Sequence, residues 1–76
     1  MEQAALMASD ERARRIREDE LDICRRAMEV HQSTARRHDA AGHPDLAEAE
    51  LARAARLRMQ VEAIERELAG DPLPEA

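Results

Sequence analysis

Apolar residues recur at steps of three and four along most of this chain, the spacing that places side chains on one face of an α-helix. Between residues 9 and 41, these positions predict a broad apolar stripe made of Ala13, Ile16, Ile23, Ala27, Val30, Thr34 and Ala41, widened by Cys24, Met28 and Ala35. Between residues 45 and 69, a second stripe contains Leu46, Ala54, Leu57, Val61, Ile64 and Leu68, flanked by Ala47 and Leu51. Two amphipathic helices are therefore expected.

Glycine and proline mark the predicted ends of these helices. Gly42 and Pro44 separate the two stripes, and Gly70 follows the second. Glycine suits the left-handed position just past a helix end, and proline cannot continue the helix before it. Asp45, with Glu48 three residues later, has the chemistry of an N-terminal cap for the second helix.

The predicted fold is an all-α, antiparallel two-helix hairpin, with helices over about 9–41 and 45–69, a turn at 42–44 and a C-terminal tail at 70–76. Three conformations are open for the N-terminal extension, residues 1–8: continuation of the first helix, a separate helical turn, or frayed chain. The first helix is about 50 Å long and the second about 37 Å. The part of the first helix before about Glu18 therefore lacks a partner within the chain. Dimerisation into a four-helix bundle would bury both stripes.

Composition strengthens the expectation of a homodimer. The chain has 76 residues, a single cysteine and no Phe, Tyr or Trp. Neither a disulfide within the chain nor a cysteine-based zinc site can stabilise it, and a core of aliphatic side chains alone buries little area. A second copy of the chain, or another protein, is the expected source of the missing core.

Charge bears on partners and compartment. Lysine is absent, and twelve arginines stand against seventeen acidic residues, for a net charge of −5. Arginine as the only basic residue type is typical of a GC-rich bacterial genome, and a net negative charge makes nucleic acid an unlikely partner. No stretch is long and apolar enough for a membrane span or a signal peptide. We therefore expect a cytoplasmic protein with no membrane contact.

Three arginine pairs, at 14–15, 25–26 and 36–37, repeat at intervals of eleven residues. Eleven residues make about three helical turns, so the pairs share one face. Acidic residues one turn away from the first two pairs indicate a solvated face with ion pairs rather than a nucleic-acid site. Only Arg36 and Arg37 lack an acid four residues before or after. The candidate partner-binding residues are Leu6, Ala13, Ile16, Arg36 and Arg37.

Four polar residues fall within the apolar stripes: Glu20, His31 and His38 in the first, and Glu50 in the second. In the hairpin, Glu50 is expected close to His38, where the two side chains would satisfy each other as a buried pair. The same four residues are weak candidates for a metal site. No Glu-x-x-His motif is present, and His31 and His38 stand about 10 Å apart along a helix, too far to share one zinc ion. No metal or other cofactor is expected.

These patterns favour a non-enzymatic function. No serine, threonine or cysteine stands in a pattern typical of a nucleophile, no glycine-rich phosphate loop is present, and a hairpin this small encloses no pocket by itself. The favoured interpretation is a small helical interaction protein, an adaptor or regulator that acts through homodimerisation or contacts with another protein. The alternatives are a nucleic-acid-binding hairpin dimer and a metal-binding helical bundle.

Overall fold

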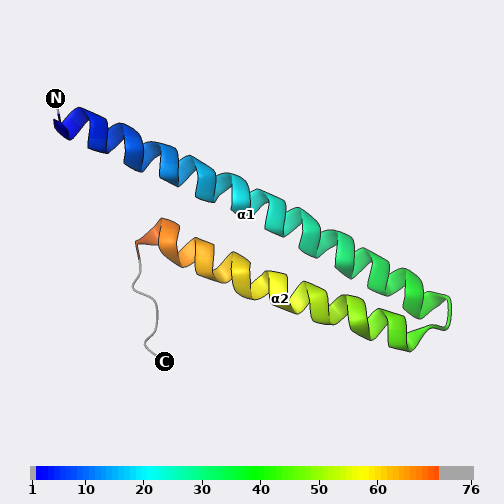
Figure 1. Ribbon diagram of the computed structural model, residues 1–76. Coiled ribbons are helices and arrows are strands. Elements are labelled where there is room, and N and C mark those ends of the chain that lie inside the picture. Colours follow the sequence, from blue (N-terminus) through cyan, green and yellow to red (C-terminus); the bar gives the residue numbers. More distant parts are fainter. Residues whose placement is uncertain (1, 71–76) are drawn as a thin grey trace.

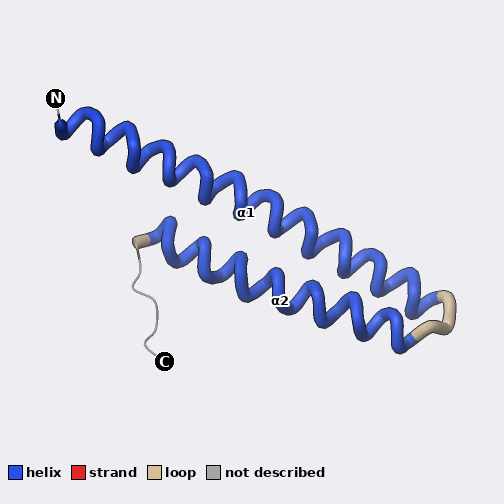
Figure 2. Tube along the Cα trace, in the orientation of Figure 1, coloured by secondary structure: helices blue, strands red, loops and turns tan. Residues whose placement is uncertain are grey.

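The computed structural model describes the backbone of residues 2–70 and the side chains of residues 9–70. Two helices, α1 (Glu2–Ala40) and α2 (Pro44–Ala69), form an antiparallel hairpin (Figure 1). Figure 2 shows that a short loop joins them and that no strand accompanies them over the described residues. The predicted all-α hairpin is confirmed. Helix α1 begins at Glu2, so residues 2–8 continue the first helix.

Gly42 ends α1 and reverses the chain. Its φ of 81° is left-handed, a conformation that glycine adopts without steric cost. The Gly42 amide donates to the carbonyl oxygen of Asp39 at 3.1 Å, and the His43 amide donates to that of His38 at 2.8 Å. These two bonds form a Schellman motif, which satisfies carbonyl groups that the end of a helix would otherwise leave unpaired.

Helix α2 starts one residue earlier than predicted, at Pro44. Proline is favoured at the first helical position because its φ already fits the helix and the missing amide would have no helical partner there. The residue at the cap position is His43, whose side chain makes no capping hydrogen bond. The prediction of an Asp45 cap is therefore wrong, and Asp45 lies within the first turn, where its negative charge favours the positive end of the helix dipole.

The core of the hairpin is small and lies between the two helices. Leu21 of α1 packs with Val61 and Ile64 of α2, and Cys24 and Leu68 cover this cluster. Towards the turn, the described residues that are buried are all alanines, namely Ala35, Ala47 and Ala54. Alanine allows the two helices to approach closely but buries little apolar area.

The face of α1 that packs on α2 is not the centre of the predicted stripe. Ile16, Ile23 and Val30 are 54%, 66% and 59% exposed, so their assignment to the hairpin core is wrong. Ala13, Ala41 and Leu46, which the sequence also placed towards a core, are exposed as well. The residues of α1 that approach α2 are displaced by about one position, as Leu21, Cys24, Met28 and Ala35 show. Helix α1 therefore has two adjacent apolar faces, and α2 covers one.

The hairpin is a single layer of helices. Its extents are 62 × 26 × 13 Å, and the smallest is close to the diameter of one helix with its side chains, about 10–12 Å. The radius of gyration is 17.3 Å, whereas a compact chain of this length has about 11 Å. Within the described residues, neither helix is both long enough and apolar enough to cross a membrane. Domains usually bury their apolar faces between two layers, and this hairpin has only one.

Candidate interaction surface

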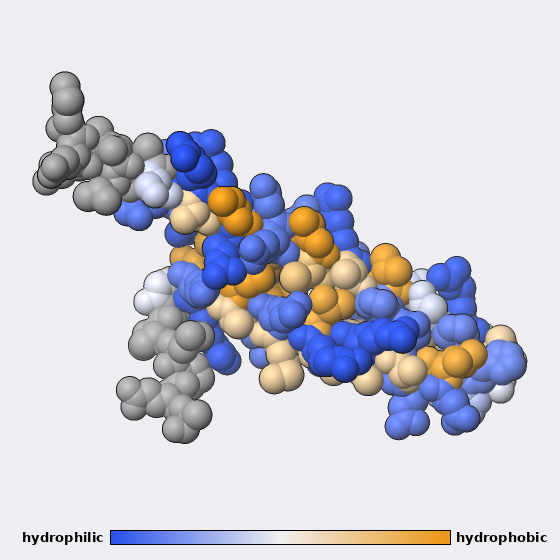
Figure 3. All heavy atoms as spheres, viewed as in Figure 1, coloured by the Kyte–Doolittle hydropathy of each residue, from blue (hydrophilic) through white to orange (hydrophobic). Residues whose placement is uncertain are grey.

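The exposed residues Ile16, Ile23 and Val30 form a row along α1, which we call the α1 apolar row. They are seven residues apart, the repeat that keeps side chains on one line when helices pack side by side. Figure 3 shows hydrophobic groups at intervals along α1, separated by polar ones. Each side chain of the row is more than half exposed. An apolar row at this spacing is typical of a helix with a second packing partner.

A groove of about 390 Å³ runs beside the middle of the α1 apolar row. Arg17, Glu20 and Ile23 line it from α1, and Gln60, Ala63 and Glu67 line it from α2. The groove is open to solvent along its length and has small or flexible residues on the α2 side. It is shaped to receive side chains from a surface packed against the hairpin rather than to enclose a small molecule.

Glu20 lies at the edge of this groove and is paired within the chain. Arg17 donates to Glu20 at 2.9 Å and also forms an ion pair with Glu67 of α2 at 2.9 Å. The hydrogen bond to Glu20, together with the attraction of Glu67, raises the pKa of Arg17 above its ordinary value. The two carboxylates are thereby partly neutralised, which lowers the cost of covering the polar end of the groove.

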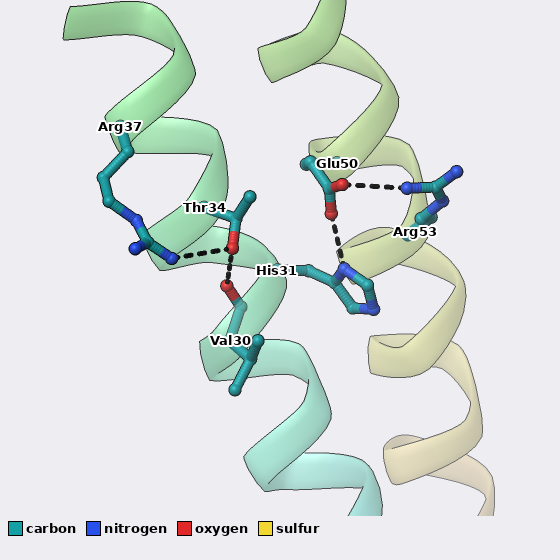
Figure 4. A network of polar contacts seen from close by, with 6 residues as sticks. All are labelled: Val30, His31, Thr34, Arg37, Glu50 and Arg53. Carbon is teal, nitrogen blue, oxygen red and sulfur yellow. Dashed lines mark hydrogen bonds and ion pairs between the residues drawn. The ribbon is translucent and has the colours of Figure 1, made fainter.

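A second polar cluster connects the helices nearer the turn (Figure 4). His31 Nδ1 lies 2.5 Å from Glu50 Oε2, and Arg53 donates to the other carboxylate oxygen of Glu50 at 2.8 Å. Because an ionised carboxylate only accepts hydrogen bonds, the Nδ1 of His31 carries the hydrogen. The side chain of Glu50 is 13% exposed. The hydrogen bond from His31 lowers the pKa of Glu50, with a smaller contribution from the positive charge of Arg53.

The expected pairing of Glu50 with His38 is therefore wrong, since the partner is His31. Glu50 lies six residues after Pro44, about 9 Å along α2. His38 is in the last turn of α1, where its carbonyl oxygen accepts from His43. At that level of the hairpin, the chain places Ala35 and Ala47 between the helices.

The four candidate metal ligands do not converge. His31 and Glu50 pair with each other, Glu20 pairs with Arg17, and His38 lies nearer the turn. Over the described part of the chain, no three His, Cys, Asp or Glu residues are grouped so that they could hold a metal ion. The geometry offers a hydrogen-bonded bridge between the helices, and it gives no support to the metal-binding alternative.

The candidate partner-binding residues are spread over the molecule. Ile16 lies in the α1 apolar row and Ala13 is exposed one turn before it, while the side chain of Leu6 lies outside the described residues. Arg36 and Arg37 are exposed at the turn end of α1, and they form no ion pair with the residues whose side chains are described. The sequence interpretation did not include Ile23 and Val30 in this set. Their signal was a stripe too wide for one partner helix.

Replacing Glu50 with glutamine is expected to destabilise the hairpin near neutral pH but not in acid. Because the folded-state pKa of Glu50 is below its ordinary value of 4.5, its ionisation stabilises the fold above that pH, and this contribution is lost as pH falls further. Urea unfolding of both proteins at several pH values from 7 to 3 measures the difference. The gap in unfolding free energy should narrow below about pH 4.5.

Glu48→Gln is the control, because it removes an exposed carboxylate from the same helix without touching the His31–Glu50 bridge. If the difference in unfolding free energy between Glu50→Gln and the unmodified protein stays constant from pH 7 to pH 3, the lowered pKa of Glu50 is contradicted.

Comparison with known proteins adds no relative to this picture. No protein-family model matches the chain, no curated protein matches it, and no solved structure matches it. The function must therefore be argued from the faces and charges of this hairpin.

Proposed function

We propose that this chain is a small, non-enzymatic helical interaction protein whose working form is a homodimer. Two hairpins would pack through their α1 apolar rows into a four-helix bundle, and the outer helix surfaces of the bundle would contact another protein in the role of an adaptor or regulator. The expected compartment is the cytoplasm. The single observation that carries the proposal is the α1 apolar row, exposed on a hairpin only one helix thick.

The exposed area supports a partner of substantial size. The chain exposes 6298 Å². A compact protein of 8.6 kDa exposes about 4,700 Å². The difference, about 1,600 Å², is larger than the roughly 800 Å² that each partner buries in a typical stable interface. Pairing two hairpins would supply the second layer that this fold lacks.

The small core supports the same proposal. Among the residues whose side chains are described, only Leu21, Val61 and Ile64 form a buried cluster between the helices, and none of them is aromatic. Isolated two-helix arrangements of this size are marginally stable because little apolar area leaves water. Anything that binds only the folded hairpin stabilises it by mass action, and a second copy is always available to do so.

The mass in solution tests the proposal directly. Sedimentation equilibrium should give twice the chain mass of 8.6 kDa at micromolar concentration. Helical circular dichroism should fall on dilution, because dissociation removes the intermolecular part of the core. A fully helical particle of 8.6 kDa at every concentration would refute the homodimer.

A further inference from the structure

We infer that the dimer forms through an antiparallel α1–α1 seam centred on Ile23, so that each hairpin turn lies at the opposite end of the bundle from the other. This inference rests on the proposed homodimer and specifies its geometry. The occupant of the exposed face is thus a second copy of the same face, related by a two-fold axis that passes beside Ile23.

The position of Ile23 supports this centre. It is the middle residue of the α1 apolar row, with Ile16 and Val30 seven residues on either side. In an antiparallel seam, Ile23 meets Ile23 of the other copy, and Ile16 meets Val30. All three apolar side chains are then matched with apolar side chains, as an interface that repeats under a two-fold axis requires.

Charges beside the row distinguish the two possible directions. Asp19 and Arg26 lie on the same side of the row, one turn before and one turn after Ile23, and both are exposed. Arg26 also forms an exposed ion pair with Asp22 of its own helix at 3.1 Å. In the antiparallel seam, Asp19 of one copy lies level with Arg26 of the other, and the symmetry makes this opposite-charge pair twice. In a parallel seam the two-fold axis runs along the helices and places equivalent residues on opposite sides of the row, so Asp19 and Arg26 would not face each other. Complementary charges select partner orientation, so this pair favours the antiparallel direction.

The same register gives the end of α1 a partner. Helix α2 ends beside Arg14 and Arg17, which contact Leu68 and Glu67, and α1 continues beyond that point (Figure 1). In the antiparallel seam, this projecting end lies along the turn end of the other α1.

Site-directed crosslinking tests the direction of the seam. In a Cys24→Ser background, Asp19→Cys and Arg26→Cys each place one thiol on an exposed position beside the row. The two proteins are treated with a short bismaleimide, separately and after mixing under conditions that allow subunit exchange. We expect crosslinked dimers only in the mixture, because like positions in an antiparallel seam stand about 10 Å apart along the axis.

The outcomes separate this inference from the homodimer itself. Crosslinking of either variant alone that is as efficient as crosslinking of the mixture would contradict the antiparallel register, and a dimer that crosslinks in no combination would show that another face is used. Either result overturns the seam and leaves the homodimer standing. A monomer in sedimentation equilibrium would overturn both.

Charge reversal provides a second measurement that needs no crosslinker. Asp19→Arg should weaken the dimer by about tenfold, because two repulsive pairs with Arg26 replace two attractive ones. Adding Arg26→Asp to the same chain restores opposite charges across the antiparallel seam and should recover most of the affinity. A double variant no tighter than the single one would overturn the proposed register.

Discussion

Replacing Ile23 with aspartate is expected to turn the dimer into a monomer. Ile23 is 66% exposed on the single hairpin, so the substitution removes little from the intramolecular core. In the proposed dimer, it removes two buried isoleucine side chains, each of which contributes about 1.5–3 kcal/mol, and brings two carboxylates together. The dissociation constant should rise by a hundredfold or more, since about 1.4 kcal/mol corresponds to a factor of ten. Sedimentation equilibrium measures the change.

Met59→Asp is the matched control for that substitution. Met59 is 71% exposed, and it lies two residues from Val61, which places it about 200° around α2 from the buried face. It therefore presents the same apolar-to-acidic change on a surface remote from the α1 apolar row. The control should keep the dimer mass. Loss of the dimer in Met59→Asp, with a dimer retained in Ile23→Asp, would show that the interface lies on α2 and not on the α1 apolar row.

The two helices and their C-terminal ends could be predicted from the sequence because their signals are local. Gly42 and Gly70 both adopt the left-handed conformation expected just past a helix end. Pro44 occupies the first helical position of α2, one residue before the predicted start of that helix. These constraints act within one or two turns of chain and do not depend on what the helix packs against.

The packed face could not be predicted from periodicity alone. The positions 16, 20, 23, 27, 30 and 34 and the positions 17, 21, 24, 28, 31 and 35 are both spaced by four and three, and they lie side by side on α1. Sequence reasoning merged them into one stripe centred on Ile16, Ile23 and Val30. Only the second helix decides between them, because the selected face is the one that fits Val61 and Ile64. The predicted core therefore lacks Leu21, which supplies the α1 side of the buried cluster.

For the polar cluster between the helices as well, the local pattern could be predicted from the sequence but the packing between the helices could not. The sequence indicated that a histidine and Glu50 would pair between the helices, but it named His38 instead of His31. The identity of the partner depends on the register that the turn sets between α1 and α2. An error of two helical turns in that register exchanges one histidine for the other. The pair Arg36 and Arg37 could be recognised from the sequence as lacking an acid one turn away, and neither arginine forms an ion pair with the described side chains.

Replacing Leu21 with alanine is expected to have the largest effect on the hairpin itself. Leu21 is 9% exposed and supplies the α1 side of the buried cluster. Truncating a buried leucine costs about 2–5 kcal/mol, through lost transfer energy and the cavity left behind. For a domain of this size, each kcal/mol shifts the melting temperature by about 4–8 °C, so a fall of about 10 °C or more is expected in thermal unfolding followed by circular dichroism. Leu51→Ala, at an exposed leucine of α2, should leave the melting temperature almost unchanged.

The Leu21 and Ile23 variants together separate folding from assembly. Leu21→Ala weakens the intramolecular core but leaves the α1 apolar row intact, so its melting temperature should rise with protein concentration as dimerisation opposes unfolding. Ile23→Asp removes the dimer, so its melting temperature should be independent of concentration. A concentration-independent melting temperature for both variants and for the unmodified chain would mean that the hairpin folds without a partner. The exposed row would then contribute nothing to the stability of the fold.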